Sequence, residues 1–205
     1  MSWYDDRILP RLINFACSTR PQARQREKVV PHATGDVLEI GFGSGLNLPY
    51  YDTGNVRRVW GLEPSAGMRR LARDRIDEST IDVELIDLPG EEIPLDSNSV
   101  DTVVVTYTLC TIPDVADALD GIRRVLKSDG RLLYCEHGKA PDANVFKWQA
   151  RLNAGWKKFS GGCNMHRDIP ALLDDSGFHI EDDNRMYLPG IKALTYNYWG
   201  TARIR

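Results

Sequence analysis

Short apolar runs alternate with amphipathic stretches along most of the chain, and this alternation limits the possible folds more strongly than any other feature. The clearest run is VDTVVVT at residues 100–106, which is almost continuously β-branched or apolar. Such a run is typical of a central strand that is covered on both faces. Strands that alternate with helices pair in parallel through crossover connections. The sequence therefore predicts an α/β fold built on a mostly parallel sheet.

We expect seven strands, with helices in several of the intervals between them. The expected strands are Asp36–Ile40, Arg58–Leu62, Asp82–Leu85, Val100–Thr106, Gly130–Glu136, His179–Asn184 and Leu194–Tyr198. The expected helices are roughly Gly45–Tyr51, Ala66–Glu78, Asp114–Leu126 and Asp168–Ser176. The last two strands are joined through Leu188-Pro189-Gly190, and the interval is too short for a crossover helix. This pair should therefore be antiparallel.

A single domain over residues 1–205 fits the length of the chain, which is enough for a sizeable core. Residues 1–33 are expected to form an N-terminal helical extension, because Ile8, Leu9, Leu12 and Ile13 recur at helical spacing. This extension could pack on the domain, cover a cofactor pocket, or touch a membrane surface through its arginines.

The net charge argues against nucleic acid as a general partner, whereas the distribution of charge is compatible with anionic partners. The formal net charge of −3 argues against a general nucleic-acid binder. Residues 1–35 nevertheless carry six basic and three acidic side chains, and residues 137–170 carry six and two. An anionic substrate or a lipid surface is therefore compatible with these two segments. No run of 18 apolar residues occurs, so we expect no membrane-spanning helix. The start of the chain also does not resemble a secretory signal.

The cysteine pattern indicates the compartment and argues against a metal. Cys17, Cys110, Cys135 and Cys163 are scattered singly, and no CxxC pair occurs. This spacing predicts no zinc site. Four cysteines without a secretion signal are simplest to explain as reduced thiols, so we expect a cytoplasmic protein. Peripheral contact with a membrane stays compatible with that location.

The stretch DVLEIGFGSGLN, residues 36–47, predicts a nucleoside-containing cofactor. Gly41, Gly43 and Gly45 follow an expected strand, and glycine lets a ligand lie against the backbone. About 20 residues further on, the next expected strand ends at Glu63. A carboxylate there suits a ribose diol, because it can accept two O–H hydrogen bonds.

Two details favour S-adenosylmethionine over a dinucleotide. Dinucleotide folds use GxGxxG, but this chain has Leu46 where the last glycine would be needed. Glu39 lies just before the loop, where a carboxylate would face a pyrophosphate unfavourably. The same carboxylate suits a cofactor that carries ammonium and sulfonium groups. An oxidoreductase on the same type of sheet is therefore disfavoured.

With these motifs in order, the chain resembles class I S-adenosylmethionine-dependent methyltransferases. The resemblance lies in LEIGFGSGLN, GLEPS, EEIPLDSNSVDTVVVTYTLC and VLKSDGRLLYCEH, and it covers most of residues 34–200. It implies a doubly wound, Rossmann-like sheet of seven strands, parallel except for the last strand, which is inserted. It also implies S-adenosylmethionine as the cofactor and methyl transfer as the reaction.

The resemblance also assigns cofactor-binding residues. Glu39, the loop from Gly41 to Gly45, and Asn47 would hold the methionine portion. Glu63 would hold the ribose, Pro64 would lie beside the adenine, and Thr106 would line the cofactor from below. Relatives often carry an aspartate where this chain has Pro89, so the adenine contacts fall to Gly90 and Glu91.

The segment at residues 137–170 is the expected acceptor pocket. Its pattern EH…W…GCN…R resembles the mammalian alkyl-thiol methyltransferases and their bacterial relatives. The mammalian members have an N-terminal membrane anchor, whereas this sequence shows only the short amphipathic stretch Trp3–Cys17. His137 is the candidate catalytic residue, because an imidazole there could deprotonate a thiol or hydroxyl. The candidate substrate residues are Cys163, Asn164 and His166.

Several functions stay open at this point. Methyl transfer to a small, apolar acceptor is favoured, with a thiol as the preferred nucleophile. The alternative is a methyltransferase that acts at a membrane surface, on a phospholipid headgroup or a quinone precursor. A protein that binds the cofactor without catalysis is a lesser alternative.

Overall fold

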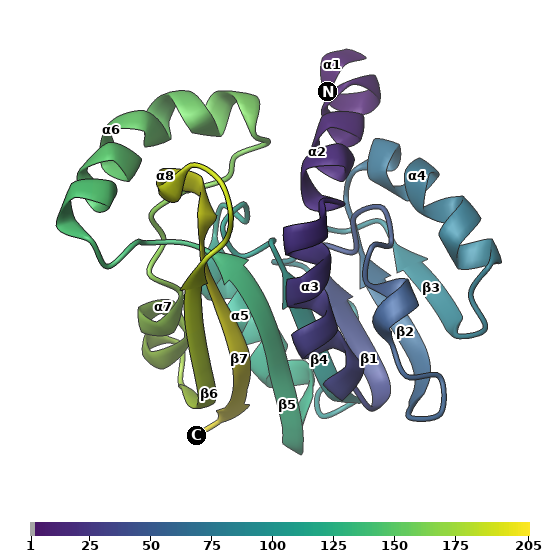
Figure 1. Ribbon diagram of the computed structural model, residues 1–205. Coiled ribbons are helices and arrows are strands. Elements are labelled where there is room, and N and C mark those ends of the chain that lie inside the picture. Colours follow the sequence, from purple (N-terminus) through teal and green to yellow (C-terminus); the bar gives the residue numbers. More distant parts are fainter. Residues whose placement is uncertain (1–2) are drawn as a thin grey trace.

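The computed structural model describes residues 3–205, and it is organised around a seven-stranded sheet (Figure 1). The sheet order is β3-β2-β1-β4-β5-β7-β6. The strands are β1 (Gly35–Ile40), β2 (Val56–Leu62), β3 (Asp82–Ile86), β4 (Val100–Thr106), β5 (Leu126–His137), β6 (Phe178–Tyr187) and β7 (Tyr196–Ile204). Met1 and Ser2, which begin the expected N-terminal extension, lie outside the described residues.

The pairing of the strands confirms the predicted fold class. Strands β1 to β5 pair in parallel, while β7 is antiparallel to both of its neighbours, β5 and β6. The closing hairpin of β6 and β7 is therefore antiparallel, as its short connection predicts. Strand β7 is inserted between β5 and β6, which is the doubly wound arrangement expected from the resemblance.

Helices cover both faces of this sheet (Figure 1). The α-helices among the described residues are α1 (Trp3–Arg7), α2 (Leu9–Cys17), α3 (Arg20–Val29), α4 (Ala66–Asp77), α5 (Val115–Val125), α6 (Ala143–Phe159), α7 (Ile169–Asp175) and α8 (Lys192–Thr195). Alternate residues of one strand enter different cores. Val104 packs with α3 and α4 on one face, while Val103 and Val105 pack with α5 and α7 on the other. Burial on both faces explains why β4 is almost continuously apolar.

Helices α1 and α2 stand above the carboxyl ends of the strands, next to α4 (Figure 1). A Cβ on Gly67 in α4 would lie 2.5 Å from Pro10 of α2 and from the Asp6 carbonyl, so these helices approach closely. Ligands bind at the carboxyl ends in sheets of this type. The N-terminal extension therefore covers the edge where the site is expected.

Two sequence predictions were wrong in detail. The expected helix over Gly45–Tyr51 is a series of turns with one short 3₁₀ helix, Leu48–Tyr50. Gly45 has a positive φ, and Pro49 has no N–H for an α-helical hydrogen bond. The last strand begins at Tyr196 rather than Leu194, because Lys192–Thr195 form the short helix α8.

The structure also bears on membrane insertion. Within residues 3–205, no helix is both long enough and apolar enough to cross a bilayer.

Candidate active site

The glycine loop that follows β1 forms an open cradle whose backbone only glycine adopts readily. Gly41, Gly43 and Gly45 all have φ between 60° and 76°, a region that L-residues rarely adopt. A Cβ on Gly41 would overlap the Thr108 side chain at 2.3 Å, so this glycine is needed for packing. A Cβ on Gly43 would meet only the Gly41 carbonyl, at 3.8 Å. The space above Gly43 is therefore free for a ligand.

Glu63 connects this cradle to the neighbouring strand. Its side chain is buried at the end of β2, where one carboxylate oxygen accepts from the Gly43 N–H at 2.9 Å and the other from the Ser65 N–H at 2.8 Å. Burial raises the pKa of Glu63, although these two N–H donors oppose the shift. The carboxylate thus lies at the rim of the glycine loop, where a diol could share it.

Glu39 lies beneath the loop in a buried network. Its carboxylate accepts from the Tyr51 hydroxyl at 2.7 Å and from the Asn47 amide at 2.9 Å. The same amide nitrogen reaches the Thr106 hydroxyl at 3.0 Å. The structure thus brings three of the predicted cofactor residues together, and the sequence reasoning missed Tyr51. Burial raises the pKa of Glu39 to about 7.

The raised pKa of Glu39 predicts that this side chain lowers the free energy of unfolding increasingly as the pH rises. Because the folded pKa is above the ordinary value of 4.5, the carboxyl group's contribution to stability is complete below that pH and is lost as the pH rises through about 7. Glu39→Gln should therefore gain stability relative to the unsubstituted protein, by roughly 2 to 3 kcal/mol, between pH 5 and pH 8. Urea unfolding across this range measures the difference. Glu84→Gln, at an exposed position, is the matched control. If the free energy of unfolding changes equally with pH in Glu39→Gln and in the unsubstituted protein, the prediction is contradicted.

Arg26 is a buried cation near this network that the sequence analysis did not single out. It lies on α3 with 4% of its surface exposed, and it donates to the Cys17 carbonyl at 2.7 Å. Its Nε has no hydrogen-bond partner, and among the described residues no carboxylate lies within 4.0 Å of its guanidinium. The guanidinium stacks 5.3 Å from the ring centre of Tyr107 and is near enough to oppose the rise in the pKa of Glu39. A buried guanidinium without an anion is costly, so this position suits an anionic ligand.

The residues expected near the adenine lie further along the same edge. Pro64 is exposed, while Gly90 is buried, and a Cβ on Gly90 would lie 2.9 Å from Ile40 and Ile112. Glu91 accepts from the Asp114 N–H at 3.3 Å, at the start of α5. Its carboxylate thus supports that helix start as well as lying beside the expected adenine position.

Helix α2 bridges the cradle and the expected acceptor segment. Asn14 accepts a hydrogen bond of 2.6 Å from the Ser44 hydroxyl in the glycine loop. Leu9 and Ile13 lie against Gly161, at 3.7 and 3.3 Å from a Cβ placed there. Helix α2 therefore contacts both the glycine loop and the segment that follows α6.

At the carboxyl end of β5, His137 and two cysteines form a cluster. His137 ends β5, and its Nε2 lies 2.8 Å from the Sγ of Cys163. Cys110, which the sequence analysis did not place here, joins them, and the three donor atoms lie within 4.8 Å of one another. Burial alone would lower the pKa of His137, but the Cys163 contact and the Glu136 carboxylate outweigh it and raise this pKa.

Backbone N–H groups fix the loop that carries Cys110. Glu136 is fully buried, and its carboxylate accepts from the N–H groups of Thr108, Leu109 and Cys110 at 2.6, 3.0 and 3.4 Å. Tyr107 has a φ of 56°, which is uncommon outside glycine and turns the chain sharply after β4. This strained turn brings the loop over the end of β5.

Asn164 and His166, the other two predicted substrate residues, have different positions. Asn164 bonds to the Cys110 carbonyl through its backbone N–H at 2.8 Å and its side-chain amide at 3.2 Å, so it holds Cys163 next to Cys110. The ring of His166 packs edge-on against Phe146 of α6, with centroids 6.2 Å apart. His166 is not part of the cluster around His137.

Helix α6 has an inverted arrangement of polar and apolar side chains. Gln149 and Asn153 are buried, and Gln149 alone bonds to the backbone of Gly138, Ala140, Met165 and Ala193. Trp148 and Phe159 are instead 56% and 74% exposed. These two aromatics therefore do not pack in the core.

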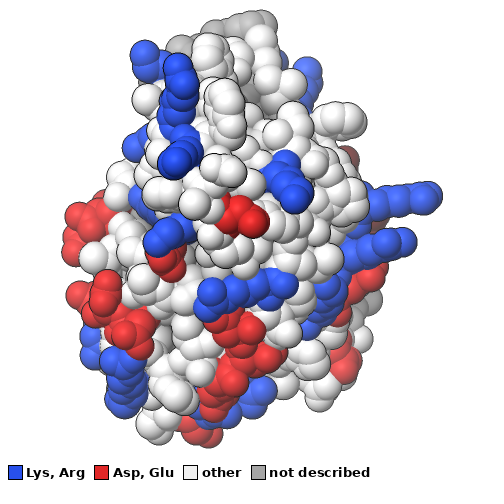
Figure 2. All heavy atoms as spheres, turned by 60° about the vertical axis from the view of Figure 1, so that its left-hand side comes forward, with Lys and Arg blue, Asp and Glu red and all other residues white. Residues whose placement is uncertain are grey.

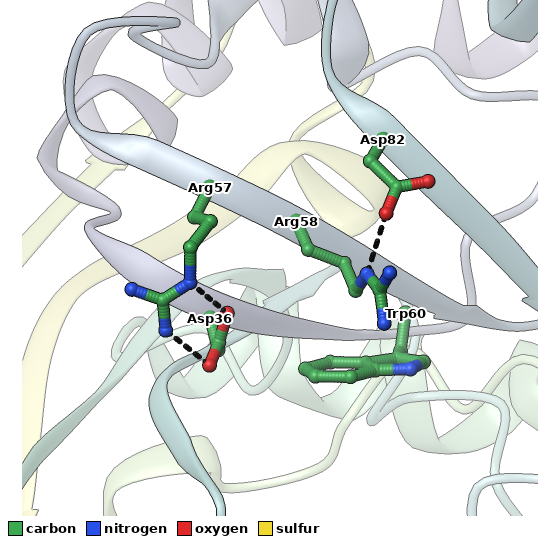
Figure 3. Close-up of a pocket in the computed structure, with 5 residues that line it drawn as sticks. All are labelled: Asp36, Arg57, Arg58, Trp60 and Asp82. Atoms are coloured by element: carbon green, nitrogen blue, oxygen red, sulfur yellow. Dashed lines mark hydrogen bonds and ion pairs between the residues drawn. The ribbon is translucent and has the colours of Figure 1, made fainter.

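The hollow drawn in Figure 3 lies at the opposite edge of the sheet. It has a volume of about 280 Å³ and is lined by early residues of β1, β2 and β3. Its charges are satisfied internally: Arg57 pairs with Asp36, and Arg58 pairs with Asp82 at 2.6 Å while lying over Trp60 (Figure 3). Paired charges at the amino ends of strands favour a structural role over ligand binding.

The region that contains the candidate site is similar in sequence to known methyltransferases. Residues 38–134, which include the glycine loop, Glu63 and Thr106, match the family described as a methyltransferase domain. The human thiol S-methyltransferase TMT1B is 32% identical over 152 residues, covering 71% of this chain and 62% of that protein. The mitochondrial methyltransferase OMS1 of Saccharomyces cerevisiae is 27% identical, covering 80% and 38%.

A further relative and a solved structure extend the comparison. The phosphatidylethanolamine N-methyltransferase of Cereibacter sphaeroides is 30% identical, covering 60% of this chain and 63% of that protein. The chain spans less than two thirds of the length of these three relatives. An S-adenosylmethionine-dependent methyltransferase from Aquifex aeolicus has the same fold, with a TM-score of 0.66 and 17% identity, covering 96% of this chain and 98% of that one.

Proposed function

Since the chain carries a class I, S-adenosylmethionine-dependent methyltransferase domain, we propose that it transfers a methyl group from this cofactor to a small acceptor, and that the acceptor is a thiol. The observation that carries the proposal is the open cradle above Gly43, rimmed by the buried carboxylate of Glu63. This cradle lies at the same edge of the sheet as the cluster of His137 and two cysteines.

The described residues fit the cofactor in charge as well as in shape. The Glu39 carboxylate beneath the loop provides negative charge for an ammonium or a sulfonium group. The unpartnered Nε of Arg26 provides a donor for a carboxylate. Glu63 would hold the ribose, and the loop near Gly90 would hold the adenine. The cofactor, when bound, supplies a methyl group activated by the positive sulfur.

The chain's own part in the reaction is alignment, exclusion of water and treatment of the acceptor proton. The Cys110 loop lies against the end of β5 through Glu136, and helix α2 lies against the glycine loop and Gly161. His137 lies there at a strand end, where it can orient the nucleophile or take its proton. A thiol needs little activation, because a few per cent of a thiol with a pKa of about 8.5 is ionised near neutrality.

The assignment to Arg26 gives a selective prediction. Arg26→Met should weaken the binding of S-adenosylhomocysteine, the demethylated cofactor, about tenfold, because a charge-assisted hydrogen bond contributes about 1.5–3 kcal/mol. Binding of 5′-methylthioadenosine, which lacks the amino-acid portion, should stay unchanged. Titration calorimetry measures both. Arg24→Met, at an exposed position on the same helix, is the control. Equal losses for both ligands would remove Arg26 from the carboxylate site.

Acceptor identity is tested by transfer of a labelled methyl group. Purified protein is incubated with tritiated S-adenosylmethionine and a panel of alkyl thiols, phenols, a quinone precursor and phosphatidylethanolamine vesicles. We expect label in the thiol products. Label only in the lipid or quinone products would contradict the thiol acceptor and support a methyltransferase that acts at a membrane surface. Cofactor binding without any labelled product would support a non-catalytic binding protein.

The lipid-directed alternative is supported by a specific surface. Phe15 on α2 and Trp148, Leu152 and Phe159 on α6 are at least half exposed. Helix α6 also carries four basic and no acidic side chains. Figure 2 turns the α6 side forward and shows Lys and Arg in the upper part of that face, with most of the visible acidic side chains lower down. Such a surface suits peripheral contact with anionic lipid.

The compartment is proposed from the thiols. All four cysteines are unpaired in the structure, and Cys110, Cys135 and Cys163 are buried. Unpaired thiols are typical of reducing compartments. We therefore assign the protein to the cytoplasm, with contact at a membrane face as the alternative location.

A further inference from the structure

We propose that Cys110, His137 and Cys163 form a zinc site with one open coordination position. The three residues come from different parts of the fold: the loop after β4, the end of β5, and the segment after α6. They lie far apart along the chain, so a search for closely spaced cysteines does not detect them. The spacing argument that predicted no zinc site therefore does not apply to these residues.

The geometry is close to that of a tetrahedral site. The three donor atoms lie within 4.8 Å of one another, and His137 Nε2 is 2.8 Å from Cys163 Sγ. Zinc bonds of about 2.3 Å to sulfur and about 2.1 Å to nitrogen place neighbouring ligand atoms about 3.5–3.8 Å apart. The separations in the structure differ from these by at most about 1 Å. Two thiols and one imidazole are the donor set that zinc prefers, and no carboxylate belongs to the cluster.

The backbone around the cluster is held in place without a metal. Glu136 fixes the Cys110 loop by accepting three backbone N–H groups. Asn164 ties the segment that follows Cys163 to the Cys110 carbonyl at 2.8 Å. His137 is fixed by the pairing of β5 with β7. Only 2% of Cys110 and 8% of Cys163 are exposed, so both thiols are removed from water. These supports preorganise the three ligands.

Three protein ligands, rather than four, are typical of catalytic zinc sites, where substrate or water takes the remaining position. This part of the inference rests on the proposed function. An acceptor thiol that binds at the open position loses its proton to solvent and stays there as a thiolate. Its sulfur forms the bond to the methyl carbon, the bond from that carbon to the cofactor sulfur breaks, and the electron pair remains on that sulfur. The products are a thioether and S-adenosylhomocysteine. His137 Nε2 is then a metal ligand, so it is not the base.

Metal content tests the site independently of catalysis. Tag-free protein is dialysed against zinc and then against metal-free buffer, and zinc is counted by mass spectrometry. We expect about one equivalent in the unsubstituted protein and in Cys135→Ala, which removes a buried thiol outside the cluster. Cys110→Ser, Cys163→Ser and His137→Gln should each retain less than a tenth of that amount. Circular dichroism confirms that each variant is folded.

Cobalt substitution is a second readout that requires no variant. Co²⁺ bound to the unsubstituted protein should give sulfur-to-metal charge-transfer absorption and the visible bands of a tetrahedral site. Absence of zinc and of these cobalt bands from the unsubstituted protein, or a zinc content that does not depend on the three residues, would overturn the proposal.

Methyl-transfer assays on the same samples separate this inference from the proposed function. One equivalent of zinc without transfer to any thiol would retain the site and refute the thiol acceptor. Transfer at an undiminished rate after verified removal of zinc would retain the function and overturn the catalytic zinc. Loss of transfer on zinc removal, with recovery on zinc addition, supports both.

Discussion

Glu63→Ala is expected to weaken the binding of S-adenosylhomocysteine at least tenfold. The side chain is buried at the rim of the glycine loop, where it accepts the Gly43 N–H at 2.9 Å and the Ser65 N–H at 2.8 Å. Truncation removes the proposed acceptor for the ribose diol and leaves the Gly43 N–H without its partner. Hydrogen bonds to a charged group contribute about 1.5–3 kcal/mol, so losing one changes affinity by roughly ten- to a hundredfold.

Two companion variants separate binding from folding. Glu63→Gln keeps the size of the side chain and can still accept one N–H, so it should lose affinity while unfolding at nearly the same urea concentration. Glu78→Gln changes an exposed residue that follows α4 and should bind normally. Unchanged affinity in Glu63→Ala would show that Glu63 only caps the start of α4 and links it to the loop.

His137→Ala is expected to lower the turnover of thiol methylation about a hundredfold, while the affinity for S-adenosylhomocysteine stays unchanged. Its Nε2 faces Cys163 at the end of β5, and no cofactor contact is proposed for it. The expected loss has the same direction whether His137 takes the acceptor proton, which contributes about 10²–10⁴-fold, or serves as a zinc ligand, and the metal content of the variant distinguishes the two roles. Initial-rate kinetics at saturating cofactor measure it.

The control for this experiment is His179→Ala, because His179 is exposed on β6. That variant should keep full turnover. Wild-type turnover in His137→Ala would reduce His137 to a scaffold residue. A parallel loss of cofactor affinity would instead mean that the substitution disturbs the whole carboxyl edge of the sheet.

The order of elements could be predicted from the sequence because it depends on local patterns. The β-branched run Val100–Thr106 is bounded in the structure as predicted, since a strand covered on both faces has an unambiguous composition. The stretch Gly45–Tyr51 was less predictable. There the buried carboxylate of Glu39 binds Asn47 and Tyr51, and these long-range contacts stabilise turns where a helix was expected.

The acceptor side was harder to predict, because its contacts join distant parts of the chain. His137 and Cys163 could be named from the segment itself, but Cys110 joins them only through the strained turn at Tyr107. The same holds for Arg26, whose burial depends on how α3 packs against the sheet. On α6 the polar side chains Gln149 and Asn153 are buried while Trp148 and Phe159 are exposed, which is the reverse of what residue type alone predicts.

Calorimetric titration of the purified protein with S-adenosylhomocysteine, alongside NAD as the rival nucleotide, tests the central claim most directly. We expect one binding site of micromolar affinity for S-adenosylhomocysteine and no heat with NAD. No binding of S-adenosylhomocysteine at millimolar concentration to folded protein would contradict the account of the cradle formed by Gly43, Glu39 and Glu63.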